Sequence, residues 1–361
     1  MIFPDEFRMI RAAVLLSFIA AALGEQWAID LSTTITYITG VGASSANLVA
    51  AAGGQNGVGS VVEYYDGTQW SKNKVPSLMV MATAVSGAGT IIAPGMGSIL
   101  VSGDGKTYVE APNLKGVAQT ADAYGSNKEN FAVAGSWETT DATTGKPRSA
   151  SGVAYSTDNG ASFSVSGNVP DGYVRYGAYP SDQVWYVASG IWGEDPAAAG
   201  RSLSARMKLD TVGKQAVLDL EPRKQFRHAD TNATGWFGSV SKTTDGGATW
   251  TQVLQTNLAE DYLYFNEISC GSELNCVVVG EGDGSTGGYL TVAYATFDGG
   301  KSWERTLSSS DFVSSMVAKF TGPNTVWIVP TKKSGRTLSA QFMKSIDGGK
   351  TFSLVQALDN C

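Results

Sequence analysis

The stretch KTTDGGATWTQV, from Lys242 to Val253, decides the fold because its pattern recurs along the chain. The pattern is Ser/Thr-x-Asp-x-Gly-x-Ser/Thr-aromatic. It has four full copies, at Asp158, Asp245, Asp298 and Asp347, and two shortened copies, at Asp66 and Asp104. The Asp carboxylate of such a turn can accept hydrogen bonds from backbone N–H groups of the same turn, and glycine supplies the positive φ angle. We therefore expect each copy to be a hairpin corner whose Asp is structural.

The spacing of these corners predicts a repeat protein. The interval from Asp158 to Asp245 is about twice as long as the others, which suggests a lost copy. Short apolar strands recur in parallel, from ANLVAAAG near residue 46 to NTVWIVP near residue 324, and ATGWFGS near residue 230 is a candidate for the missing one. A period of about 48 residues is typical of propeller blades with four antiparallel strands. Both series predict one all-β domain over residues 25–361, a seven-bladed β-propeller.

Charge and composition exclude several classes of protein. The net charge of −7 and the absence of a Lys/Arg cluster argue against a nucleic-acid partner. His228 is the only histidine, so a multi-histidine metal site is excluded. We expect neither a metal nor a cofactor.

The N-terminus is typical of an export signal. Arg8 and Arg11 precede an apolar run over residues 12–23, and small residues end at Gly24. This pattern predicts a signal peptide over residues 1–24, with translation starting at Met1 or Met9, and a secreted or luminal protein. The run is too short to span a bilayer, which takes roughly 20 residues, and no later segment is apolar enough. The alternative is an N-terminal amphipathic helix packed on the domain.

Three cysteines are compatible with an exported chain that depends little on disulfides. Cys270 and Cys276 bracket a short loop, GSELN, which a hairpin can close, so we expect them to form a disulfide. Cys361 has no evident partner and is either free or joined to another chain. We otherwise expect a monomer.

Candidate ligand-binding residues follow the apolar strands. If the Asp corners join strands three and four of each blade, the loops that join strands two and three lie on the opposite face and are better placed for ligands. Candidates for ligand contact in these loops are Trp137, Glu138, Trp192, Glu194, Arg201, Glu281 and Asp283. A Trp beside carboxylates suits a sugar, whose C–H face packs on the indole. The alternative is that these Trp residues pack on neighbouring blades and that the loops are only solvated.

A catalytic alternative uses the carboxylates of the same loops. Two facing carboxyl groups could hydrolyse a glycosidic bond, about 5–5.5 Å apart for retention or roughly 6.5–9.5 Å apart for inversion. The candidates for this role are Glu138, Asp141, Glu194, Asp195, Glu281 and Asp283.

The repeated corner resembles the Asp-box (BNR) repeat of sialidases, xyloglucan-type hydrolases, sortilin-like receptors and a photosystem II assembly factor. This resemblance implies a propeller, while function has to be argued from the site. Sialidases hold their substrate with three arginines, the first in the opening blade, yet this chain has no arginine between Glu25 and Pro147. The assembly factor is closest in size, although its arginine-rich patch has no counterpart here. We expect a secreted or luminal, non-catalytic propeller that binds a protein or a glycan, with a glycoside hydrolase as the alternative.

Overall fold

A computed structural model describes residues 37–359, apart from residues 46, 56, 113, 141–146, 167–168, 171–172, 192–208, 211–214, 217–236, 257–261, 284–288 and 335–336. The signal-peptide prediction and Cys361 lie outside this range. Within the described part of the chain, no helix is long and apolar enough to span a lipid bilayer.

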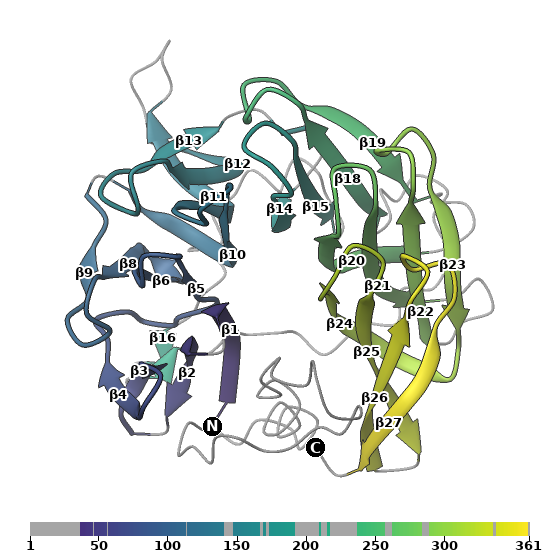
Figure 1. The fold of residues 1–361 in the computed structure, drawn as a ribbon, viewed down its shortest axis with the longest axis horizontal. Helices are drawn as coiled ribbons and strands as arrows, with labels where there is room; N and C mark the ends of the chain where they lie inside the picture. The colour runs from purple at the N-terminus through teal and green to yellow at the C-terminus, as the bar shows by residue number, and fades with distance from the viewer. Residues whose placement is uncertain are drawn as a thin grey trace.

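The chain forms six four-stranded antiparallel blades arranged around a common centre (Figure 1). Blade one contains β1 (Tyr37–Ser45), β2 (Leu48–Gln55), β3 (Gly59–Tyr65) and β4 (Trp70–Lys74). Blade two contains β5 (Ala84–Val85), β6 (Ile91–Pro94), β8 (Ile99–Ser102) and β9 (Val109–Glu110). Blade three contains β10 (Gly116–Tyr124), β11 (Asn130–Thr140), β12 (Pro147–Ser156) and β13 (Ser164–Ser166), and β7 (Met96–Gly97) pairs with the start of β10.

Blade four contains β14 (Tyr173–Ala178), β15 (Trp185–Ile191), β18 (Phe237–Thr243) and β19 (Thr251–Gln255). Blade five contains β20 (Tyr262–Cys270), β21 (Cys276–Asp283), β22 (Tyr289–Thr296) and β23 (Glu304–Ser309). Blade six contains β24 (Phe312–Phe320), β25 (Val326–Ser334), β26 (Thr337–Ser345) and β27 (Ser353–Asp359). The prediction of a propeller with four-stranded blades is thus confirmed.

The predicted number of seven blades is wrong, because the described strands form six blades and the long interval between Asp158 and Asp245 holds the first three strands of blade four. Strand β15 pairs directly with β18, from Trp185 opposite Thr243 to Ile191 opposite Phe237. The residues between these two strands therefore connect strands two and three of blade four. The segment ATGWFGS leads into β18, a third strand, and not into the second strand of a further blade. A separate two-stranded hairpin, β16 (Leu209–Asp210) and β17 (Gln215–Ala216), lies within the same connection.

The core consists of apolar side chains packed between consecutive blades. Five clusters of buried residues each combine side chains from two neighbouring blades. The second strands are buried on both faces, as in the run Val277–Val279, where every residue is 0% exposed. A blade with two buried faces needs a continuous apolar second strand, which explains the recurring apolar runs in the sequence.

Each of the six repeated Asp residues lies in the corner between the third and fourth strands of its blade. In blade four, Asp245 Oδ1 accepts hydrogen bonds from Thr243 Oγ1 at 2.6 Å and from the Thr249 N–H at 2.8 Å. Asp245 Oδ2 accepts one from Thr249 Oγ1 at 2.5 Å. These bonds lower the pKa of Asp245 to about 2, with the Thr243 hydroxyl the largest cause. The carboxylate is saturated within its own turn.

The second glycine of a corner packs against the preceding blade. Gly349 of blade six is buried and has a φ of 99°. A Cβ atom built on Gly349 would lie 2.4 Å from Val277 Cγ2 of blade five. Gly247 of blade four fits in the same way, since a Cβ atom there would lie 2.8 Å from Ser166 Cβ of blade three. The corners therefore join blades as well as strands.

The predicted disulfide between Cys270 and Cys276 is confirmed, and it closes the hairpin between β20 and β21. The loop of this hairpin also joins three blades. Its Glu273 carbonyl accepts a hydrogen bond from the Tyr186 hydroxyl at 2.7 Å, and Asn275 Nδ2 donates to the Gly348 carbonyl at 2.9 Å. Disulfides persist in oxidising compartments, so this bond fits an extracellular protein.

Candidate functional site

The described loop candidates separate into a core residue and two carboxylates. The indole of Trp137 is fully buried between blades two and three, where its Nε1 donates a hydrogen bond to the Gly152 carbonyl at 3.2 Å. It is therefore a packing residue and offers no surface to a ligand. Glu138 follows it on β11 and is exposed. Glu281, on β21, is only 5% exposed.

The remaining candidates are not placed by the structure. Asp283 ends β21, but its side chain is not described. The other candidates lie outside the described residues, namely Asp141, Trp192, Glu194, Asp195 and Arg201.

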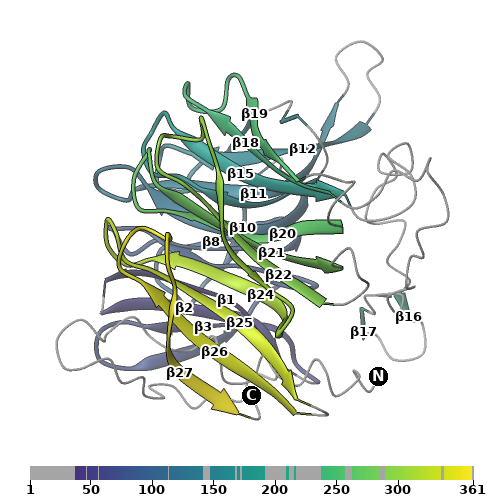
Figure 2. The ribbon, with the colours of Figure 1, turned by 90° about the vertical axis from the view of Figure 1, so that its right-hand side faces the viewer.

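Polar side chains instead gather on the first strands of the blades, which lie innermost around the centre of the propeller (Figure 1). Strands β10, β14, β20 and β24 each carry a charged residue, in the segments QTADAY, YVRYGA, YFNEIS and VAKF. In each blade strand one and strand three end on the face that carries the Asp corners, here called the corner face. The strand-two ends lie on the opposite face, here called the loop face. Figure 2 shows the blades from the side, with their strands running between these two faces.

An arginine cluster lies toward the loop face, formed by Gln119, Arg175, Tyr176, Tyr264 and Glu281. Arg175 Nε donates to Gln119 Oε1 at 3.0 Å, which links blades four and three. The Arg175 guanidinium carbon lies 5.8 Å from the centre of the Tyr176 ring and 6.0 Å from that of Tyr264. The Tyr264 hydroxyl in turn donates to Glu281 Oε1. Side chains of blades three, four and five thus lie around one guanidinium group.

An ion pair lies nearer the corner face. Lys319 Nζ of β24 is 3.3 Å from Asp122 Oδ1 of β10, which joins blades six and three on opposite sides of the centre. These side chains are 45% and 40% exposed although protein surrounds them, so they face an opening.

Glu267 of β20 shares this region. Burial raises the pKa of Glu267 to about 8, while Lys319 lowers it and Asp122 raises it further. The Glu267 carboxyl group is therefore largely protonated at neutral pH, which leaves Lys319 with Asp122 as its ionised partner.

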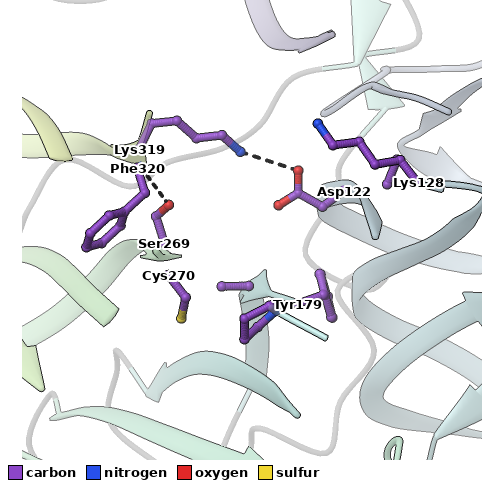
Figure 3. A pocket seen from close by; sticks show the side chains of 10 residues that line it. Asp122, Lys128, Tyr179, Ser269, Cys270, Lys319 and Phe320 are labelled. Atoms are coloured by element: carbon purple, nitrogen blue, oxygen red, sulfur yellow. Dashed lines mark hydrogen bonds and ion pairs between the residues drawn. The ribbon is translucent and has the colours of Figure 1, made fainter. Parts of the chain in front are cut away.

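A cavity of about 170 Å³ opens beside this ion pair (Figure 3). Blades three to six all contribute to it, through Asp122, Ala123, Lys128, Ala178, Tyr179, Pro180, Ser269, Cys270, Lys319 and Phe320. It lies at the corner face, because these residues occupy the ends of the first strands and the turns that follow them.

The described residues offer no evident site for a metal ion. Among them there is no group of three or more His, Cys, Asp or Glu residues that could hold one. The carboxylates near the centre are instead engaged with a lysine or with a tyrosine hydroxyl. The arrangement offers fixed charges and hydrogen-bond donors to a ligand.

Sequence reasoning missed most of these inner residues because it followed the loops after the apolar second strands. Glu281 was among the candidates, whereas Asp122, Arg175, Glu267 and Lys319 were not. The available signal was a charged residue within the strand that precedes each apolar run. In a propeller this strand lines the centre, so a charge there faces the opening and not the core.

Comparisons with known proteins show the fold. No protein-family model matches the chain, and no curated protein matches it in sequence. A structure described as YCF48 bound to D1 peptide is similar, with 13% identity and a TM-score of 0.50 over 90% of this chain and 82% of that chain.

Two structures of the polysaccharide lyase PL25-ulvanlyase are also similar, one of them bound to -[GlcA(1-4)Rha3S]-. Each has 11% identity and a TM-score of 0.54 over 88% of this chain and 82% of that chain. At such low identities a shared fold does not convey a shared function. These structures therefore establish a β-propeller, and the Asp-box resemblance rests on the motif alone.

Proposed function

We propose that this protein is an exported, non-catalytic propeller that binds a segment of a protein partner at its loop face. The observation that carries the proposal is the arginine cluster, in which Arg175 is hydrogen-bonded to Gln119 and lies near the rings of Tyr176 and Tyr264. Arg and Tyr are enriched among the residues that dominate protein–protein binding energy.

The cluster is suited to binding because its geometry is fixed in advance. Arg175 is half-buried, and its hydrogen bond to Gln119 keeps the guanidinium from sampling other positions. A pre-organised side chain loses little conformational entropy when a ligand binds, so more of the contact energy appears as affinity. Guanidinium groups bind the carboxylates and backbone carbonyls of extended segments.

The comparisons support a peptide as the ligand, since a propeller of similar fold was solved with a peptide bound. The disulfide between Cys270 and Cys276 supports the exported location.

The glycan and hydrolase alternatives have less support in the structure. Trp137, which would have stacked on a sugar, is part of the core. Two of the six candidate catalytic carboxylates have described side chains, namely Glu138 and Glu281. They belong to different blades, three and five, and Glu281 accepts a hydrogen bond from the Tyr264 hydroxyl.

Peptide selection against the immobilised protein tests the proposal. We expect the selected peptides to bind the wild type. Arg175→Gln should lower their affinity about tenfold or more, because a charge-assisted hydrogen bond is lost. Arg305→Gln is the matched control, because Arg305 also stacks on a tyrosine, with its guanidinium carbon 5.2 Å from the Tyr294 ring, but on the outer strand β23.

Two results would refute the binding role at this site. One is a selection that returns no peptide, and the other is peptides that bind Arg175→Gln and the wild type equally well. A glycan array and an assay for reducing-sugar release, run on the wild type and on Glu281→Gln, test the alternatives with the same preparations.

A further inference from the structure

The corner-face cavity has a feature that the proposed function does not use, namely an excess of positive charge in an acidic protein. Lys128 and Lys319 both line it, and Asp122 is the only acidic residue in its lining. Figure 3 shows the ammonium ends of Lys128 and Lys319 directed toward the same opening as the Asp122 carboxylate. The chain as a whole carries a net charge of −7, so the positive charge of the cavity lining is opposite in sign to that of the whole protein.

Lys128 is held in place by an unusual backbone. Its φ of 52° lies in the left-handed region, which residues other than Gly, Asn and Asp seldom adopt. Two backbone hydrogen bonds fix this conformation: the Lys128 N–H donates to the Gly125 carbonyl at 3.1 Å, and the Lys128 carbonyl accepts from the Gly87 N–H of blade two at 3.0 Å. Within the described residues, the Lys128 ammonium group has no partner.

The two lysines supply several hydrogen-bond donors to the cavity. Lys319 has three N–H donors, and Asp122 Oδ1 is its one acceptor among the described residues. Ser269 Oγ accepts from the Phe320 N–H at 3.0 Å, which leaves its O–H free to donate. A ligand that complements this set must supply acceptors.

We propose that the corner-face cavity is a binding site for a small oxyanion, a carboxylate or a phosphate group, held between Lys128 and Lys319. Such a group offers two or more acceptor oxygens and one or two negative charges, which match the unused lysine donors and the net positive charge of two ammonium groups and one carboxylate. The volume of about 170 Å³ exceeds what a single water needs by roughly an order of magnitude, so a small organic acid fits. A bound cation is disfavoured, because both lysines would repel it.

The charge of Asp122 does not prevent this binding, because Lys319 already neutralises it at 3.3 Å. The raised pKa of Glu267 supports the proposal, since its carboxyl group adds little negative charge at neutral pH. The site lies on the face opposite to the arginine cluster, so it is independent of the peptide site proposed above.

The test is an NMR titration of the full chain with two separate probes, glutarate and inorganic phosphate, at low ionic strength. We expect saturable amide shifts at Lys128, Ser269 and Phe320 with a Kd of about 1–10 mM for at least one probe, typical of a few charge-assisted contacts. Saturation by glutarate alone assigns a carboxylate ligand, and saturation by phosphate alone assigns a phosphate ligand. Saturation by both shows that the site accepts either oxyanion.

Two variants make the test specific. Lys128→Asn removes the charge while keeping a residue that tolerates a positive φ, and we expect it to weaken binding about tenfold. Lys74→Asn is the matched control, because Lys74 is exposed on β4, far along the chain in blade one, and we expect a change of less than about twofold. The proposal is overturned if neither probe gives saturable shifts at these residues, or if Lys128→Asn and Lys74→Asn bind equally well.

Discussion

Replacing Gly349 by alanine should destabilise the protein through two effects that the structure separates. The first is backbone strain, because Gly349 has a φ of 99°, which costs an L-residue about 1–2 kcal/mol. The second is overpacking, because the new Cβ would lie 2.4 Å from Val277 Cγ2, with Ala295 and Val326 also within 3.7 Å. Val277 is 0% exposed and cannot move aside freely, so we add about 1–3 kcal/mol. The expected loss in the free energy of unfolding is about 2–5 kcal/mol.

Two further glycines serve as controls for these effects. Gly59 has nearly the same backbone, with a φ of 100°, but a Cβ there would meet nothing within 4 Å. Gly59→Ala should therefore lose only the strain, about 1–2 kcal/mol. Gly103 also has open space and lacks a positive φ, so Gly103→Ala should change stability by less than about 1 kcal/mol in either direction.

Urea unfolding followed by tryptophan fluorescence measures all three variants. The order of stability should be Gly103→Ala, then Gly59→Ala, then Gly349→Ala as the least stable. If Gly349→Ala is no less stable than Gly59→Ala, the corner does not press on the preceding blade, and the reasoning about blade contacts is wrong.

Three more perturbations follow from the bonds already described. Replacing both cysteines, Cys270→Ser with Cys276→Ser, should lower the free energy of unfolding by about 2 kcal/mol, because the short closed loop no longer restricts the unfolded chain. In Asp245→Asn, stability should fall less steeply between about pH 4 and pH 2 than in the wild type, since the pKa of Asp245 is about 2 in the folded state against 3.8 for the free group. Glu267→Gln should remove a loss of stability that the wild type shows as the pH rises from about 4.5 to about 8, because burial raises the pKa of Glu267 to about 8.

Each of these outcomes has a control and a contrary result. Under reducing conditions the cysteine variant and the wild type should unfold alike, and a difference that persists would rule out the disulfide as the cause. Asp245→Asn must be compared across the whole acid range, and parallel pH curves would show that its carboxylate is not stabilised in the folded state. For Glu267→Gln, the same pH slope as in the wild type would mean that Glu267 is ionised in the folded protein at neutral pH.

The propeller could be predicted because its repeated element is local. The corner around Asp245 binds its own backbone, so the motif forms the same turn wherever it occurs. The number of blades could not be read in this way. An interval of double length fits either a decayed blade or a long connection, and only the pairing of β15 with β18 decides between them.

The candidate site was less accessible to sequence reasoning because it depends on contacts between distant segments. Asp122 and Lys319 are nearly two hundred positions apart in the chain, and the six-bladed arrangement brings them together. Trp137 was predicted to contact a ligand for a related reason. Beside Glu138 in the sequence it resembles a ligand-binding pair, but successive residues of a strand face opposite sides, and β11 directs the indole into the core.

The close packing of some corner glycines against the preceding blade limits how such a chain can change over generations. Gly247 needs the space beside Ser166 of blade three, and Gly349 needs the space beside Val277 of blade five. A duplicated or exchanged blade would arrive with its own corner but would meet a foreign neighbour. A blade must therefore be exchanged together with the surface of the preceding blade that its corner contacts. We expect chimaeras of related propellers to fold when the crossover point lies within a blade and not between two blades.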